Sequence, residues 1–476
     1  MDIYTSIYYA SNIMYDIIEV GDNMLDSFVK LRSKYPEFVY EDFTVEDADS
    51  KYVVTYYFRI GEIELKPKIT ILKDDISNDN VDYDYLCYLF FQYGLFDLMS
   101  YYKLTCSPRL VIKPMYINEE QCSFFKKVLF NGLGEYFYKN GIDINYDNFL
   151  EIVVESDKKY TLPKFGNYSG NLIPIGGGKD SIVSMELLKK YKSDNKFFML
   201  ERNLYPKNEA GYQSVYTGGY DDSDIVVFKN ELDLELLELN KKGFLNGHIP
   251  ISACISMASF ILAYLNNKKY IVLSNEASAN EGNMEGINVN HQYSKSYEYE
   301  KDFQDYSIKY LNPNIFYFSL LRGWNEYQIV QEFLKHKEYL SVFRSCNRGT
   351  KQNIWCNHCS KCLYVYIMLY PYLDDEEMKL VFENDMLNDK TLEDVFLDLI
   401  LPDRLKPFEC VGTRLEINFA LQEALRNKKD YPYLLQLYKD KYSMNNIAKE
   451  VVENYWNSDN SIPEEYLVLF GGKDER

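Results

Sequence analysis

The sequence predicts an α/β protein with a doubly wound parallel sheet, preceded by an N-terminal α+β domain and followed by a helical C-terminal region. Three observations lead to this prediction. The 476 residues are too many for one ordinary hydrophobic core. Strand-like and helical segments alternate through the middle of the chain. Its final part is largely helical.

The N-terminal α+β domain is expected over residues 1–169. β-like stretches at residues 52–59 and 63–72 precede a helical stretch at residues 85–102. No chemical motif occurs in this part, so its role stays open. The start of the chain has neither the basic cluster nor the apolar run of a secretory signal.

The second domain, residues 170–370, should form the parallel sheet. Each expected strand is followed by a polar turn and then by a helical stretch, a rhythm that places ligands at the carboxyl ends of the strands. The expected strands are residues 171–175, 197–200, 225–228 and 270–274. An apolar run at residues 249–265 is shorter than the roughly 20 residues of a membrane span, so we expect a buried helix and no membrane partner.

The third domain, residues 371–476, should be helical, with the best helical segments at residues 416–427 and 433–442. Across the whole chain, 52 Lys and Arg against 72 Asp and Glu give a net charge of −20. Such a charge repels phosphate backbones and disfavours a nucleic-acid partner. Without an export signal, the nine cysteines are expected to be reduced thiols or metal ligands of a cytoplasmic protein. The oligomeric state is not predicted.

A glycine loop follows the first expected strand of the sheet. Gly-Gly-Gly-Lys-Asp-Ser at residues 176–181 leads into a helix expected over residues 182–191. Glycines let backbone N–H groups approach an anion, and the positive end of the helix faces the same place. Ser181 is expected to cap the helix and donate a hydrogen bond. The loop therefore predicts a phosphate or pyrophosphate cradle, although it matches neither common nucleotide fingerprint.

Four cysteines lie close together further along the chain. Two overlapping Cys-x-x-Cys steps can hold one side of a tetrahedral Zn²⁺, and an earlier cysteine can close the site. The predicted ligands are Cys346, Cys356, Cys359 and Cys362. His358 is the alternative fourth ligand, and an iron–sulfur cluster is the alternative to zinc. A site with four thiolates and no open position is structural.

A polar segment follows the fourth expected strand, where a substrate is read in this kind of fold. Residues 275–303 are rich in Asn, Glu, Ser, His and Lys. From this segment Glu276 and Asn280 are candidates for binding Mg²⁺ or ribose, and His291 and Lys295 for proton transfer. His248 is a further pocket candidate.

The glycine loop resembles the Ser-Gly-Gly-x-Asp-Ser signature of the N-type ATP pyrophosphatases, with Gly176 in place of the first serine. This resemblance implies ATP and Mg²⁺. By position, Gly177, Gly178, Asp180 and Ser181 would hold pyrophosphate, with Lys179 adding charge and Asp180 helping to hold the metal. A four-cysteine knot after such a loop also occurs in 7-cyano-7-deazaguanine synthase, although there the knot normally contains Cys-Gly-x-Cys.

Six segments in order resemble the family of UDP-N-acetyl-α-muramoyl-L-alanyl-L-glutamate epimerases. They are residues 176–181, 246–250, 274–280, 290–296, 343–349 with Trp355 and Cys356, and 406–412. The resemblance implies an ATP-dependent inversion of the terminal L-Glu of a UDP-linked muramoyl dipeptide in peptidoglycan synthesis, with release of AMP and pyrophosphate.

Inversion at a carbon requires an acid and a base on opposite faces, or one mobile group. His291 is the first candidate, followed by Lys295 and, as a thiolate, Cys410. Arg344 and Arg348 are expected to clamp the UDP phosphates. Two alternatives stay open: another adenylating enzyme, acting on a deazapurine or in tRNA thiolation, and a non-catalytic nucleotide-binding protein.

Overall fold

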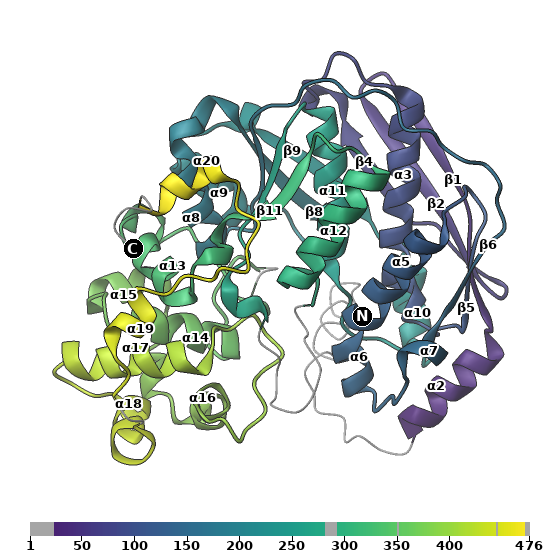
Figure 1. Cartoon of the computed structure of the whole chain (residues 1–476). Coiled ribbons are helices and arrows are strands. Elements are labelled where there is room, and N and C mark those ends of the chain that lie inside the picture. Colours follow the sequence, from purple (N-terminus) through teal and green to yellow (C-terminus); the bar gives the residue numbers. More distant parts are fainter. Residues whose placement is uncertain (1–22, 281–292, 350–351, 444–445, 472–476) are drawn as a thin grey trace.

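A computed structural model describes residues 23–280, 293–349, 352–443 and 446–471 (Figure 1). Within these residues, eleven strands form one continuous sheet in the order β11-β10-β7-β8-β9-β4-β2-β1-β5-β6, with β3 paired to β2. The strands are β1 Glu37–Ala48, β2 Lys51–Ile60, β3 Ile63–Leu65, β4 Lys68–Leu72, β5 Arg109–Ile112, β6 Glu151–Val154, β7 Asn171–Pro174, β8 Asn195–Arg202, β9 Ile225–Glu231, β10 Tyr270–Leu273 and β11 Phe316–Ser319.

The half of the sheet from β9 to β11 is parallel and confirms the predicted α/β architecture. Its order is β9-β8-β7-β10-β11, and every neighbouring pair is parallel. The order reverses at β7, where the chain first runs outwards to β8 and β9 and later returns to β10. Such a switch point is where open α/β sheets bind ligands, at the carboxyl ends of the strands.

The N-terminal strands extend this same sheet. The β4 strand pairs antiparallel with β9, and β2 pairs antiparallel with both β1 and β4. Pro67 cannot donate a hydrogen bond, and it separates β3 from β4 within the single stretch expected at residues 63–72. The N-terminal part is therefore mixed α and β, as expected, and its strands share the sheet of the next segment.

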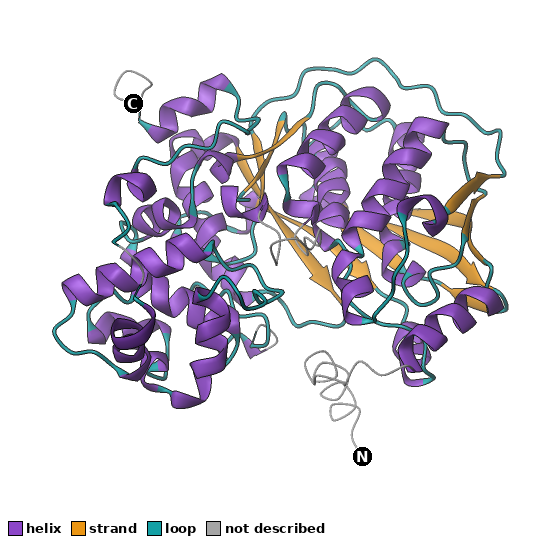
Figure 2. Ribbon diagram, turned by 60° about the horizontal axis from the view of Figure 1, so that its bottom comes forward, coloured by secondary structure: helices purple, strands orange, loops and turns teal. Residues whose placement is uncertain are grey.

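Helices cover both faces of the parallel half (Figure 2). Alternate residues of one strand face opposite cores: Leu172 of β7 packs with α3 and α11, whereas Ile173 packs with α8, α13 and the C-terminal helices. The helices up to α13 are α2 Asn23–Lys34, α3 Tyr83–Asp97, α4 Met99–Tyr102, α5 Glu119–Gly132, α6 Gly134–Lys139, α7 Tyr146–Phe149, α8 Lys179–Leu187, α9 Glu209–Thr217, α10 Glu235–Lys241, α11 Ile251–Leu265, α12 Tyr297–Tyr310 and α13 Glu326–Phe333.

The C-terminal region is helical, as predicted, and forms the lobe at the left of Figure 1. Its helices are α14 Ser360–Leu369, α15 Asp375–Val381, α16 Glu393–Ile400, α17 Arg414–Asn427, α18 Tyr433–Leu437, α19 Lys449–Glu453 and α20 Glu464–Leu467. The apolar run at residues 249–265 forms α11, which is buried between the sheet and α3. Among the described residues, we find no helix with the length and apolar character needed to cross a membrane.

Candidate active site at the carboxyl edge of the sheet

The glycine loop connects β7 to α8 at the switch point. Gly177 has φ +80°, and a Cβ atom there would lie 2.6 Å from the backbone of Ala210 and Gly211 at the start of α9. Gly178 caps α8, which begins at Lys179, earlier than expected. The expected capping role of Ser181 is wrong, because its hydroxyl donates to the carbonyl oxygen of Gly178 over 3.0 Å.

A buried lysine and three carboxylates lie beside this loop. Lys179 is 1% exposed and forms ion pairs with Asp180 and with Glu326, the first residue of α13. Carboxylate oxygens of Asp180, Glu276 and Glu326 all lie within 4.8 Å of one another. Burial raises the pKa of Glu326. Burial also acts to raise the pKa of Asp180, but the charges of Lys179 and then Lys361 lower it overall.

Lys295 and Cys410 meet although 115 positions separate them in the chain. Lys295 Nζ lies 3.1 Å from Cys410 Sγ. Lys295 ends a short turn before α12, and its carbonyl accepts a hydrogen bond from the fully buried Arg322 over 2.5 Å. The charge of Cys410 raises the pKa of Lys295, against the effect of burial, and Glu276 adds to the rise. The pair therefore lies next to the carboxylate cluster.

The segment that carries Cys410 is held by the first turn of α14. The Glu409 carboxylate accepts hydrogen bonds from Ser360 Oγ at 2.8 Å and from the Lys361 backbone N–H at 2.6 Å. Lys361 Nζ in turn donates to the carbonyl of Cys410. Because Cys359 caps this helix, the cysteine cluster and the Cys410 segment share one rigid support.

The four predicted cysteines converge. Their sulfur atoms lie within 4.8 Å of one another, with separations of 3.4 Å for Cys359–Cys362, 3.7 Å for Cys356–Cys362 and 4.0 Å for Cys346–Cys359. Four sulfurs at about 2.3 Å from a tetrahedral zinc ion would be about 3.8 Å apart, so the arrangement fits this metal. His358 is exposed and is not part of the cluster. The structure thus contains a possible Cys₄ metal site.

The other predicted residues have different surroundings. The Arg344 guanidinium donates to the carbonyls of Ser341 and Phe343 at 3.1 and 2.7 Å, and its backbone N–H donates to Gly177. Arg344 therefore holds the loop that leads into the cysteine cluster, and its phosphate-binding role stays a prediction. Arg348 is exposed. His248 Nδ1 lies 3.4 Å from a carboxylate oxygen of Glu135.

Two predicted positions cannot be located. His291 lies outside the described residues, and the same holds for the side chain of Asn280. Sequence reasoning missed Glu326, because an acidic residue in the first turn of a helix is ordinary and carries no signal of its own. It also missed Glu409, whose only distinguishing feature in the sequence is its position next to Cys410.

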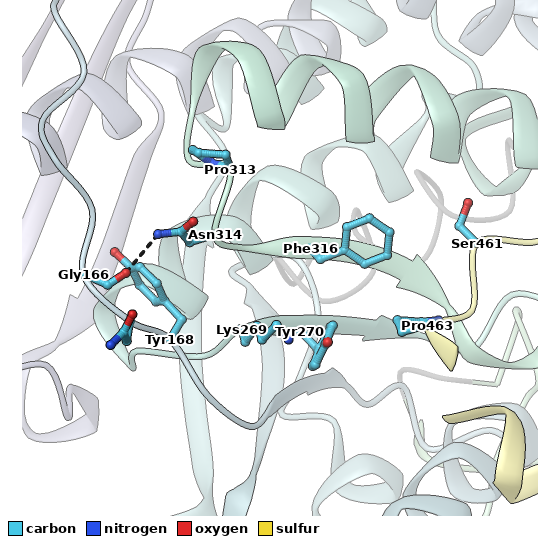
Figure 3. A pocket seen from close by; sticks show the side chains of 10 residues that line it. Gly166, Tyr168, Lys269, Tyr270, Pro313, Asn314, Phe316, Ser461 and Pro463 are labelled. Atoms are coloured by element: carbon cyan, nitrogen blue, oxygen red, sulfur yellow. Dashed lines mark hydrogen bonds between the residues drawn. The ribbon is translucent and has the colours of Figure 1, made fainter. Parts of the chain in front are cut away.

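A cavity of about 530 Å³ lies elsewhere, at the amino ends of β10 and β11 (Figure 3). Tyr270 and Phe316, the first residues of these strands, line it together with Lys269 and Pro463. In an open α/β sheet, ligands bind at the opposite, carboxyl edge. The glycine loop, and not this cavity, is therefore the candidate functional site.

A glycine loop, a carboxylate cluster and a lysine–thiol pair at one switch point define an α/β protein with a candidate anion-binding site at the carboxyl edge of its sheet. Comparison with known families identifies it further. Models of the MurL N-terminal domain and the MurL C-terminal domain match residues 29–320 and 342–453. The chain belongs to the MurL family, and the resemblance carried by its six segments is confirmed.

Three relatives are each named UDP-N-acetyl-alpha-D-muramoyl-L-alanyl-L-glutamate epimerase. The protein from Xanthomonas oryzae pv. oryzae is 31% identical over 331 residues, which cover 68% of this chain and 71% of the relative. The Micromonospora sp. protein is 32% identical over 334 residues, with the same shares. The Salinispora tropica protein is 32% identical over 332 residues, 68% of this chain and 70% of the relative.

Proposed function

We propose that this protein is an ATP-dependent epimerase that converts the terminal L-Glu of UDP-MurNAc-L-Ala-L-Glu to D-Glu in peptidoglycan precursor synthesis. AMP and pyrophosphate are the other products. Family membership supports the reaction, and the contact between Lys295 and Cys410 beside the glycine loop carries the assignment of the site. ATP and a UDP-linked substrate are cytoplasmic compounds, so we propose that the protein acts in the cytoplasm.

Activation by ATP explains why an epimerase needs a phosphate cradle. The α-carboxylate of the terminal glutamate is an anion, so removing the adjacent proton would place two negative charges side by side. Transfer of AMP to that carboxylate forms a mixed anhydride and cancels its charge. The α-proton then becomes acidic enough for a side chain to remove, provided that the enolate oxygen is stabilised. Water finally cleaves the anhydride and releases AMP.

The residues around the loop supply the groups that adenylation requires. The glycine loop leads into the positive end of α8, so backbone N–H groups at residues 176–181 would hold the phosphates, and Lys179 would add charge. Asp180, Glu276 and Glu326 offer three oxygens within 4.8 Å, a donor set that suits Mg²⁺. An Mg²⁺ ion held by these residues would neutralise charge on the phosphates.

Cys410 is the proton-transfer group that we propose for one face of the α-carbon. The thiolate is the reactive form of cysteine, and an ammonium group 3.1 Å away stabilises it. The hydrogen bonds from Lys361 fix the main chain at this position. Inversion needs a second group on the opposite face, for which His291 stays the prediction. The Cys₄ site is proposed to hold a structural Zn²⁺ that keeps the α14 support in place.

The test follows two signals in one reaction. Wild-type protein with ATP, Mg²⁺ and the L-Glu substrate in heavy water should form AMP and incorporate deuterium at the glutamate Cα. Cys410→Ser should retain most AMP formation but lose at least about a hundred-fold in deuterium incorporation, since it lacks the proton-transfer group. Cys122→Ser, which alters a half-buried thiol on α5, is the matched control and should change neither signal.

Other outcomes would contradict the proposal in distinct ways. Full deuterium incorporation by Cys410→Ser would exclude Cys410 as the proton-transfer group and leave the adenylation intact. No AMP with the L-Glu substrate, but AMP with 7-carboxy-7-deazaguanine, would identify a nucleobase enzyme. ATP binding without turnover of either compound would identify a nucleotide-binding protein.

A further inference from the structure

A second group of charged residues lies at the carboxyl edge, on the β8 and β9 side of the glycine loop. Arg202 is the last residue of β8, and Asn230 lies near the end of β9. Asp97 ends α3, and its carboxylate accepts a hydrogen bond from Asn230 Nδ2 at 2.8 Å. Lys103 follows α4 and contacts the loop before α11. None of these side chains is used in the reaction proposed above.

Lys103 is a buried cation without a carboxylate partner among the described residues. It is 8% exposed, and its Nζ donates to two neutral oxygens, Asn246 Oδ1 at 2.7 Å and the Gly247 carbonyl at 2.9 Å. Burial, and then the charge of Arg202, lower the pKa of Lys103 to about 8. The ammonium form therefore still predominates at pH 7.

Arg202 also has few hydrogen-bond and ion-pair partners among the described residues. Its Nε atom is buried and has no hydrogen-bond partner, and within the described ranges no carboxylate lies within ion-pair distance of its guanidinium. Burial raises the pKa of Asp97 to about 6, against the Asn230 hydrogen bond and the charge of Arg202, which both act to lower it. The charge of Arg202 thus acts on both Lys103 and Asp97. Because a buried charge is costly unless it is paired, the Lys103 ammonium, with only neutral oxygens as partners in the described part of the chain, and the unpartnered Arg202 Nε point to an anion that arrives with a ligand.

We propose that Lys103 and Arg202 form a phosphate-binding subsite for one of the two nucleotides of the reaction, a proposal that rests on the function proposed above. The planar guanidinium of arginine pairs with phosphate through two hydrogen bonds, and lysine adds a point charge. The Arg344 guanidinium already donates to two backbone carbonyls, so the two cations on this flank offer a second place for a phosphate in addition to the predicted arginine clamp.

The position of the subsite fits the length of the substrate. The Lys295–Cys410 pair lies beside Glu276, which follows β10, whereas Lys103 and Arg202 lie at the ends of β8 and β9. These strands are two to three positions apart in the sheet, which corresponds to roughly 10–14 Å at about 4.8 Å per strand. In the proposed substrate, the sugar and the alanine separate the diphosphate from the reacting glutamate. The subsite can therefore hold a phosphate while the glutamate reaches Cys410.

The loop that Lys103 holds also connects this subsite to the C-terminal region. It carries His248, which lies 3.4 Å from Glu135 on α6. Tyr138 on the same helix packs against Phe408, two residues before Cys410, with ring centroids 5.4 Å apart. The helix α6 thus contacts both the loop beside the subsite and the segment that carries the thiol.

The experiment measures binding of UDP and of Mg–ATP separately by titration calorimetry. Arg202→Met should lower the affinity for one of the two nucleotides by about ten-fold or more, the loss expected for a charge-assisted contact, and leave the affinity for the other unchanged. Lys103→Met should lower the affinity for the same nucleotide, and Arg202→Lys should recover part of that affinity. Arg109→Met, at a half-exposed arginine of β5 that pairs with Glu37, is the control and should bind both nucleotides normally.

Each result has one meaning. Loss of UDP affinity assigns the subsite to the UDP-linked substrate, and loss of ATP affinity assigns it to ATP. Wild-type affinity of Arg202→Met for both nucleotides overturns the inference, whatever Lys103→Met does to folding. Wild-type protein that binds neither nucleotide overturns the proposed function, whereas normal wild-type binding with an unaffected Arg202→Met protein overturns this subsite alone.

Discussion

Replacing Lys179 with methionine should destabilise the protein strongly, although the new side chain fills a similar volume. Lys179 and Glu326 are each 1% exposed, and Asp180 is 25% exposed. Without the ammonium group, three carboxylates whose oxygens lie within 4.8 Å of one another would have lost a buried counter-charge. Removing one partner of a buried pair costs about 3–5 kcal/mol, and we expect Lys179→Met to lose free energy of unfolding in this range.

The loss of free energy of unfolding in Lys179→Met should depend on pH. Burial already raises the pKa of Glu326, and the loss of the Lys179 charge, which acts to lower it, would raise the pKa of Glu326 further. A carboxyl group whose pKa is higher in the folded than in the unfolded state stabilises the fold at low pH and loses this contribution as the pH rises. The difference between Lys179→Met and wild type should therefore be larger at pH 8 than at pH 5.

Urea unfolding followed by tryptophan fluorescence measures this effect. Trp324, Trp355 and Trp456, the three tryptophans of the chain, all pack in the core on the side of the sheet that holds the pair. Adding Glu326→Gln to Lys179→Met should recover part of the loss, because one of the unpaired charges is removed. Lys241→Met, at an exposed ion pair, should change little. Equal stability of Lys179→Met and wild type at pH 8 would refute the reasoning.

Three further predictions concern the loop, the metal and a buried acid. Gly177→Ala should lower AMP formation at least about ten-fold, because of its φ of +80° and the 2.6 Å approach to α9, while Gly176→Ala, with nothing within 4 Å, should retain it. Metal analysis should find about one zinc per chain, lost in Cys362→Ser and kept in Cys122→Ser. Asp97 has a pKa raised by burial to about 6, so wild type should lose stability relative to Asp97→Asn between about pH 4 and pH 6, in urea midpoints.

The fold was predictable where local signals decide it. The strands of the parallel half are short apolar runs between polar turns, and their pattern is strong enough to locate all four expected strands. The pairing of β4 with β9 carries no such signal, because it joins two edges more than a hundred residues apart and depends on the folded sheet. The early start of α8 was missed because Gly178 caps it without a side-chain hydrogen bond.

The site was predictable to different degrees for similar reasons. The spacing of the four cysteines is local, and their sulfurs converge as expected. Lys295 and Cys410 were singled out separately, but their contact arises only when the C-terminal segment returns to the sheet. The carboxylate of Glu326 joins the cluster through the packing of α13 on α8, which no spacing in the sequence encodes.

The distribution of charge explains how a chain with a net charge of −20 can serve anionic substrates. Lys179, Lys295 and Lys361 all act on Asp180, so the cations gather where the phosphates are expected. On the other flank, Lys103 is a buried cation whose ammonium donates, among the described residues, only to neutral oxygens, and Arg202 lies close enough for its charge to act on Lys103. Exposed acidic residues elsewhere are screened by water and salt beyond about 8–10 Å. A bound nucleotide would therefore experience the local cations, while the acidic exterior repels long polyanions such as nucleic acids.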